Sequence, residues 1–211
     1  MLNFSKIHVP ESVNFRVIGF HHPYCSIKGL ADCFQGESPV DDNAFIGFGC
    51  YWMGRVGILL EFCGEESLSP KIVNRQRATM LSRIDNSEFW SNGGLLYLHI
   101  LSPHPPGISN NESLDSAYSE NVADAASIVL KLSERLNYKF PTGFQLFIST
   151  DHPLRPNVWC GTQRYVGKCD VRKSFISTSV PLISISNGVA DICQIKTNAD
   201  IFQCVGRKSG V

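Results

Sequence analysis

Two apolar, strand-like segments flank a long amphipathic segment between residues 95 and 149. Residues 95–101 follow a Gly93-Gly94 turn, and residues 144–149 form the second apolar run. Between them, residues 122–136 repeat apolar side chains at helical spacing. The apolar face of this predicted helix is Val122, Ala125, Ala126, Val129, Leu132 and Leu136, with Asn121 as the N-cap. This order of strand, helix and strand predicts a βαβ unit.

The rest of the chain gives further strands and helices. Residues 13–20 alternate as a strand, residues 26–34 fit one or two helical turns, and residues 70–84 have helix-forming composition. Residues 44–62 are apolar but carry four glycines, which favours two strands with a bend between them. Further strands are predicted at 175–179, 182–186 and 189–195.

These elements predict one α+β domain over residues 1–211. We expect a mixed, mainly antiparallel sheet with two or three helices packed on it, and a β-rich C-terminal third. Residues 102–121 concentrate Pro, Gly, Ser and Asn, so they predict a long mobile loop.

Charge and motifs narrow the function classes. Lys and Arg balance Asp and Glu at 19 each, so no net charge concentrates the protein on nucleic acid or on an anionic membrane. No apolar run is long enough for a spanning helix, so we expect no membrane partner. The sequence also lacks the signatures of P-loop, dinucleotide, zinc-protease and serine-hydrolase sites, and no cofactor is expected.

Eight cysteines are scattered along the chain without a CxxC pair. They are Cys25, Cys33, Cys50, Cys63, Cys160, Cys169, Cys193 and Cys204. Disulfide frameworks are typical of small secreted domains with little core, and this chain has 211 residues and 43% hydrophobic residues. The cysteines are therefore interpreted as mostly buried thiols, and the localisation as cytoplasmic.

The densest group of reactive side chains is His21, His22, Cys25 and Cys33. His22, Cys25 and Cys33 could supply three zinc ligands, or His22 and Cys25 could act as a base and nucleophile pair. A structural zinc site usually has a second close ligand pair, which is missing here. The alternative is that the cysteines are small core residues and the histidines end a strand.

Two segments resemble parts of the ADP-ribosyltransferase fold. The strand ending at His21-His22, with Gly47–Trp52, is similar to the His and Tyr elements of one branch, and Ser177-Thr178-Ser179 resembles a strand of another. The resemblance implies a transferase with a late Glu, yet no Glu follows Glu134. No catalytic role is carried over.

A second nucleophile hypothesis places Cys160 as the attacking group and His152 as its base, with Asp151 orienting the imidazole. Asp151 is poorly placed to reach the ring of its own neighbour. Asp151-His152-Pro153 is also typical of the exit from a strand into a loop. This group and the His22 and Cys25 group are the two candidates for a cysteine- or histidine-dependent hydrolase or transferase.

Aromatic and basic side chains alternate between residues 159 and 173. The candidate partner-binding residues are Trp159, Arg164, Tyr165, Lys168 and Arg172. Trp, Tyr and Arg dominate protein interfaces, and the same mixture suits single-stranded nucleic acid. The sequence therefore predicts a noncatalytic protein-binding module of an assembly, adaptor or inhibitor type. An RNA-binding or single-stranded nucleic-acid-binding subunit is the alternative.

Overall fold

The computed structural model describes most of the elements that build the core. Its described residues are 4–10, 12–20, 22–36, 70–100, 102, 113–150, 153–160, 165, 167–172 and 181–188. The strands predicted within 44–62, at 175–179 and at 189–195 lie outside these ranges. Among the described residues, no helix combines the length and the apolar character needed to cross a bilayer.

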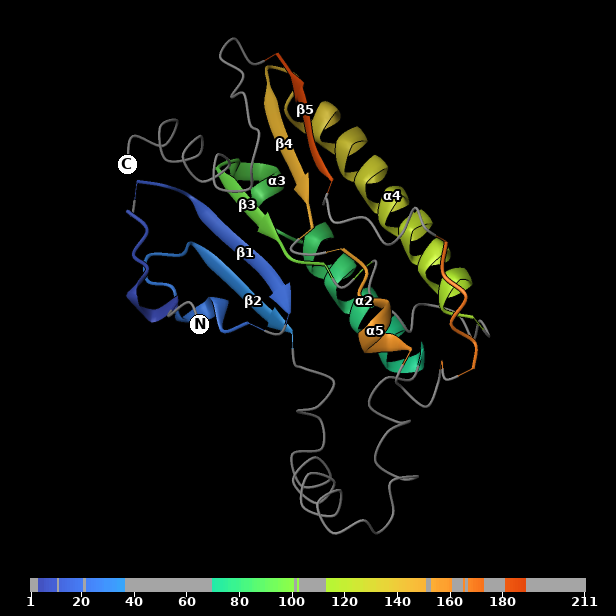
Figure 1. Ribbon diagram of the computed structural model, residues 1–211. Coiled ribbons are helices and arrows are strands. Elements are labelled where there is room, and N and C mark those ends of the chain that lie inside the picture. Colours follow the sequence, from blue (N-terminus) through green and yellow to red (C-terminus); the bar gives the residue numbers. More distant parts are fainter. Residues whose placement is uncertain are drawn as a thin grey trace.

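Three parallel strands form the first sheet. β1 (Phe15–Phe20) lies between β2 (Asp32–Gly36) and β3 (Leu95–Leu98), in the order β2-β1-β3. Ile18 is opposite Phe34 of β2 and Leu98 of β3. The arrowheads of all three strands point the same way in Figure 1, so their carboxyl ends share one edge of the sheet.

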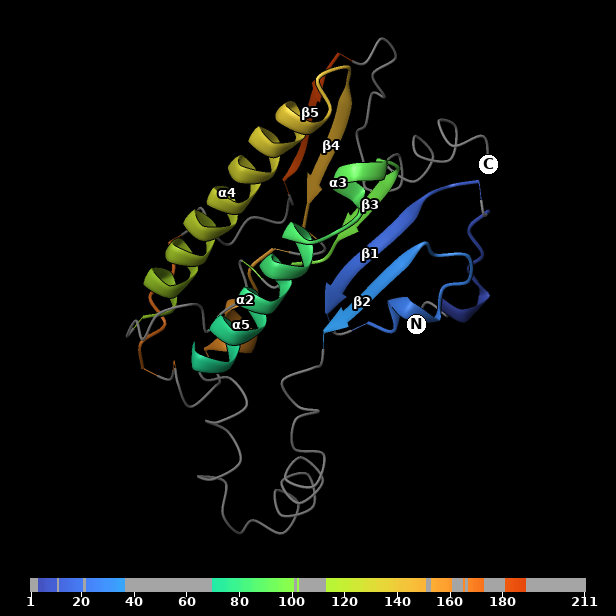
Figure 2. The same cartoon turned by 180° about the vertical axis from the view of Figure 1, so that it is seen from behind.

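A second sheet pairs β4 (Phe144–Ser149) with β5 (Leu182–Asn187) in antiparallel fashion. The long helix α4 (Leu114–Lys139) runs alongside this pair in both views (Figures 1 and 2). Leu132 of α4 packs into the same cluster as Leu146 and Ile185 of the strands. α4 therefore covers one face of the antiparallel pair.

The prediction of a mixed, mainly antiparallel sheet is wrong, because the larger sheet is parallel and the antiparallel pair is separate. The predicted βαβ unit is also wrong, since β3 and β4 belong to different sheets. An apolar pattern indicates which face of a strand is buried. It does not indicate whether the strand runs parallel or antiparallel to its neighbour, or which strand that neighbour is. Residues 32–36, predicted to be partly helical, instead form edge strand β2, which the segment 21–31 connects to β1.

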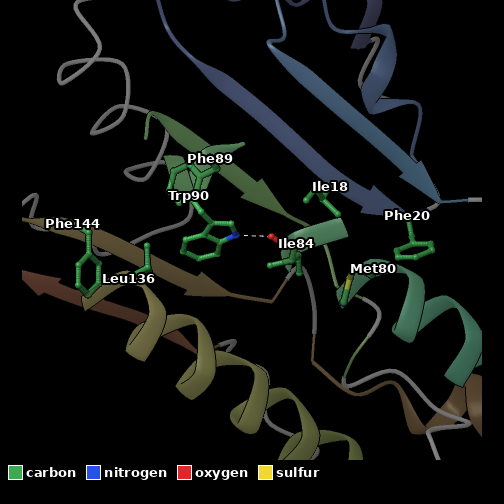
Figure 3. Close-up of a cluster of buried hydrophobic side chains, with 8 residues drawn as sticks. All are labelled: Ile18, Phe20, Met80, Ile84, Phe89, Trp90, Leu136 and Phe144. Atoms are coloured by element: carbon green, nitrogen blue, oxygen red, sulfur yellow. Dashed lines mark hydrogen bonds between the residues drawn. The ribbon is translucent and has the colours of Figure 1, made fainter. Parts of the chain in front are cut away.

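The main core lies where both sheets meet the helices. α2 (Pro70–Asp85) agrees with the predicted helix, and the short helix α3 (Phe89–Asn92) follows it. Figure 3 shows the core side chains converging from β1, α2, α3, α4 and β4: Ile18, Phe20, Met80, Ile84, Phe89, Trp90, Leu136 and Phe144. The indole Nε1 of Trp90 donates to the carbonyl of Ile84 at 2.5 Å, which satisfies the polar atom of this buried ring.

Helix α4 begins well before its predicted start. Ser113 is the N-cap, and its hydroxyl accepts from the backbone N–H of Ser116 at 3.2 Å. Residues 114–121, expected in the loop, are therefore helical. Asn121, the predicted N-cap, is buried inside the helix, and Val122, predicted to face the core, is exposed.

An ion pair with an almost completely buried carboxylate joins α2 to α4. The Nε of Arg77 donates to Oδ2 of Asp124 at 2.7 Å, and Nη2 donates to Oδ1. The hydroxyl of Ser102 also donates to Asp124, at 3.2 Å. The Asp124 side chain is 7% exposed and that of Arg77 is 28% exposed. The two-pronged geometry fixes the distance and the rotation of α4 relative to α2.

A second contact joins the same helices nearer the core. The guanidinium of Arg135 lies 4.1 Å from the centre of the Trp90 ring, and its Nη1 donates to Asp85 Oδ1 at 2.5 Å. Nη2 donates to the carbonyl of Asp85 at 2.9 Å, close to the end of α2. Because the Asp85 side chain is 70% exposed, solvent screens the charged part of this contact.

We expect Asp124→Asn to lower the free energy of unfolding by about 3 kcal/mol. This is near the low end of the losses measured when one partner of a buried ion pair is removed, because the Arg77 side chain is partly exposed to solvent. Asp85→Asn is the matched control and should cost less than about 1 kcal/mol, as exposed pairs do. Urea unfolding at constant m-value measures both losses. Equal, small losses in the two variants would show that the Asp124 pair does not hold the helices together.

Candidate functional site

Two histidines follow the carboxyl ends of neighbouring parallel strands. β1 ends at Phe20, and His22 and Tyr24 follow; β3 ends at Leu98, and His99 comes next. The backbone N–H of His99 donates to the carbonyl of Ile18 at 2.9 Å, so the pairing of β1 with β3 continues to this residue. Ligands of open α/β sheets bind at this edge, outside the carboxyl ends of the strands.

The three side chains form one contact group. The Tyr24 hydroxyl is 3.0 Å from Nδ1 of His99, and the same nitrogen is 3.1 Å from the carbonyl oxygen of Phe20. The ring of His22 stacks on that of His99 at 5.6 Å between centroids with 16° between the planes, and it meets Tyr24 edge-on at 5.5 Å. Nδ1 of His99 can accept from the Tyr24 hydroxyl or donate to the Phe20 carbonyl, depending on which ring nitrogen carries the proton.

The close approach of Tyr24 depends on Gly19. A Cβ at position 19 would lie 2.7 Å from the Tyr24 ring and 3.3 Å from Cβ of His99. A real Cβ does not come so close to a ring, so the buried Tyr24 occupies space that only glycine leaves open. The 3₁₀ turn η2 (Tyr24–Ser26) carries the tyrosine over this face of β1.

A disulfide fixes η2 to β2. Cys25 is bonded to Cys33, with 5.5 Å between their Cα atoms. Neither sulfur is a thiolate in this form, so the zinc and nucleophile hypotheses for His22, Cys25 and Cys33 require the bond to be reduced. Cys25 is also exposed rather than a core residue. Of the predicted ligand set, the structure leaves His22 and adds His99 beside it.

The second cysteine candidate is also oxidised. Cys160 is bonded to Cys169, with Cα atoms 5.5 Å apart. A nucleophilic role of Cys160 therefore needs reduction first, and its proposed base His152, with Asp151, lies outside the described residues. The interpretation as buried thiols is wrong for these four described cysteines, all of which are paired. Spacing along a sequence does not reveal pairing, which depends on the fold.

Two of the predicted partner-binding residues, Trp159 and Tyr165, pack against the first turns of α4. Tyr165 is fully buried against Leu114 and Ala117, and Trp159 packs on the edge of the same cluster. The carbonyl of Lys168 accepts from the N–H of Leu114 at 3.4 Å, which occupies a donor of the helix's first turn. The Lys168 side chain is exposed, and Arg164 lies outside the described residues.

Arg172, another predicted partner residue, is bound within the chain. Its Nε donates to both carboxylate oxygens of Asp115, at 2.9 and 3.0 Å, and its backbone N–H donates to Oδ1 at 2.9 Å. Its Nη2 also donates to the hydroxyl of Ser119. The side-chain hydrogen bonds from Arg172 are the main cause that lowers the pKa of Asp115, followed by the backbone bond. The pair attaches residues 167–172 to the first turns of α4.

Arg172→Gln should raise the pKa of Asp115 toward its ordinary value of 3.8, because the charged hydrogen bonds disappear. Since the folded pKa is the lower one, the pair contributes stability above 3.8, and this contribution is lost as the pH falls through the folded pKa. An NMR titration of the Asp115 carboxyl carbon in both proteins measures the change. An unchanged midpoint in the variant would contradict the contact.

We expect a digest of unreduced protein to give two linked peptide pairs, Cys25 with Cys33 and Cys160 with Cys169. Mass spectrometry identifies each pair, and the same digest after reduction and alkylation is the control. Alkylation of any of these four cysteines without prior reduction, or linkage of Cys25 to a different cysteine, would overturn the assignment.

The sequence analysis named His22 as a candidate and named neither Tyr24 nor His99. The signal for His99 was present, because His21-His22 follows the predicted strand 13–20 and His99 lies within the predicted strand 95–101. It becomes meaningful only when the two strands are known to be parallel neighbours. Among the described residues, no group of three or more His, Cys, Asp or Glu side chains could hold a metal ion.

Comparison with known proteins adds no relative to this description. No protein-family model, no curated protein and no solved structure matches the chain.

Proposed function

We propose that the chain is a noncatalytic protein-binding module, held together by disulfides, that binds its partner through the outer face of α4 beside β5. The observation that carries this proposal is the exposure of large apolar side chains on a helix whose other face is buried. Leu130 is 64% exposed and Tyr138 is 79% exposed. Large apolar side chains that remain exposed can mark a protein interface.

The two side chains lie on adjoining sides of α4. Leu130 and Tyr138 are eight residues apart, which is about 12 Å along a helix and a rotation of about 80°. Exposed Lys131 and Glu134 lie between them in sequence. An apolar anchor flanked by charges of both signs fits the arrangement of a protein interface, with an apolar centre and a polar rim.

The edge of β5 extends this surface. The Nδ2 of Asn187 donates to Oδ1 of Asn137 at 2.8 Å, which places β5 against this side of α4. Leu130 lies two turns before Asn137 on the same side, at helical spacing. Ile183 is on the same face of β5 as Asn187 and is 48% exposed. Leu130, Tyr138 and Ile183 are called the α4-β5 surface below.

The alternatives have less support among the described residues. For nucleic acid, Arg172 is committed to Asp115, and Tyr165 is buried where base stacking would need an exposed ring. For cysteine chemistry, Cys25 and Cys160 are oxidised. Protein binding is supported by the exposed apolar side chains of Leu130 and Tyr138 among the described residues.

The disulfides also change the expected compartment. The cytoplasmic expectation depended on reading the cysteines as thiols, and four of them are paired. Disulfides persist in oxidising surroundings such as secretory compartments and the cell exterior. We propose that the module works in such a compartment.

The test places a photo-crosslinking amino acid at position 130 or 138. Exposed Lys28, between η2 and β2, is the control position. Irradiation in the cells or secretions that contain the protein should give an adduct of one mass from 130 and 138 and none from 28. Excess wild-type protein should abolish the adduct, and excess Leu130→Asp/Tyr138→Ala protein should not.

The competitor variant should fold normally, because both substitutions are at exposed positions. Its melting temperature and circular dichroism check this. The same adduct from position 28, or no adduct from 130 and 138, would contradict the proposal. If excess Leu130→Asp/Tyr138→Ala protein abolishes the adduct as completely as excess wild-type protein does, the partner binds elsewhere on the chain.

A further inference from the structure

We propose that Asn187, the last residue of β5, is a site of spontaneous modification, at which the backbone nitrogen of Gly188 converts the side-chain amide to a carboxylate. The tripeptide Ser-Asn-Gly occurs twice in the chain, with its asparagine at Asn92 and at Asn187. The local sequence is therefore the same at both asparagines. Their surroundings differ, and only Asn187 is open to the reaction.

The reaction requires a backbone nitrogen that can approach the side chain of the residue before it. The glycine N–H loses its proton to hydroxide, and the nitrogen attacks Cγ of the asparagine. The bond from Cγ to Nδ2 breaks, and Nδ2 leaves as ammonia with a proton from water, which regenerates the hydroxide. Water then opens the cyclic imide at either carbonyl and gives aspartate or isoaspartate. Glycine favours the attack because it has no Cβ to obstruct the approach.

The N–H of Gly188 is available for this attack. Asn187 and Gly188 are both exposed, and Gly188 follows the last paired residue of β5. Among the described residues, no backbone carbonyl accepts a hydrogen bond from this N–H. The position itself requires glycine, because φ is 65° and a Cβ would lie 2.7 Å from the carbonyl oxygen of Thr142. The turn after β5 therefore places a glycine directly after Asn187.

At Asn92 the same tripeptide is protected by the fold. The N–H of Gly93 donates to the carbonyl of Phe89 at 2.8 Å, which closes the last turn of α3. The Gly93 carbonyl accepts from Nδ2 of Asn14 at 3.2 Å and from Nη1 of Arg16 at 3.3 Å. Asn92 is also exposed, but the Gly93 nitrogen must lose its hydrogen bond before it can attack.

The modification removes a bond between β5 and α4. Nδ2 of Asn187 donates to Oδ1 of Asn137 at 2.8 Å, and Nδ2 of Asn137 donates to the carbonyl of Ser133 at 3.0 Å. The second bond fixes the direction of the Asn137 amide, so a carboxylate at position 187 faces an acceptor and has no proton to donate. The product also adds a negative charge beside the α4-β5 surface. An effect on partner binding rests on the proposed function, whereas the reaction and the loss of this bond do not.

Ageing of the purified, unreduced protein in mildly alkaline, ¹⁸O-labelled water, followed by peptide mass spectrometry, tests the reaction. The label should enter at Asn187 about tenfold faster than at Asn92, because opening the Gly93 hydrogen bond comes first there. In guanidinium chloride the two rates should become similar, because both tripeptides are then unfolded. Asn187→Gln is the control and should take up no label at position 187, since its longer side chain forms the cyclic imide far more slowly.

Equal rates at the two asparagines in the folded protein would overturn the proposal. The same holds for an absence of label at Asn187, and for a difference between the sites that persists in guanidinium chloride.

Hydrogen exchange of Asn187→Asp measures the structural consequence. The backbone amides of residues 183–187 should exchange about fivefold faster than in the wild type, as the loss of one hydrogen bond that opposes local opening predicts. Asn92→Asp carries the same product at the protected site and should leave the exchange of β5 unchanged. An unchanged rate in Asn187→Asp, or an equal rise in Asn92→Asp, would refute the loss of the bond to Asn137. Because neither measurement involves the partner, these outcomes are independent of the crosslinking result.

Discussion

The ion pair between Arg77 and Asp124 is the contact on which the arrangement of the molecule depends. α2 is packed on the parallel sheet, and α4 covers the antiparallel pair, so the fold needs a fixed relation between the two helices. The bidentate bond of Arg77 to a carboxylate that is 7% exposed supplies it, and the contact of Arg135 with Trp90 and Asp85 extends it toward the core. Burying the carboxylate carries a desolvation cost, which is compensated only because the geometry is two-pronged and Ser102 adds a third bond.

The same contact determines which face of α4 remains outside. Residues on a helix are separated by about 100° of rotation each, so a side chain two positions from Asp124 points away from the core when Asp124 points inward. Val122 is therefore exposed, although its apolar character predicted the opposite. A buried polar pair thus overrides the apolar pattern in this part of the helix.

The sequence predicted elements better than it predicted their relations. α2, β1, β3, β4 and β5 lie close to their expected positions, because periodicity reports local burial. The segment 26–34 was misread because Ile27, Leu30 and Phe34 happen to fit a helical spacing, whereas Phe34 belongs to an edge strand opposite Ile18. The burial of Tyr165 depends on Leu114 and Ala117, which lie far away in the sequence. The pairing of Cys25 with Cys33 depends on how η2 meets β2. No local pattern contains that information.

The direction of the strands is also what brings His22 and His99 together. With β1 and β3 parallel, the residues after both strands emerge at one edge, and His22 and His99 stack. Had the two strands been antiparallel, as the predicted sheet favoured, six residues of β1 at about 3.3 Å each would separate these rings by about 20 Å. His22 would then have been a lone exposed histidine at the end of a strand. The correction of the sheet and the identification of His99 are therefore one result, because the chemistry at this edge follows from the topology.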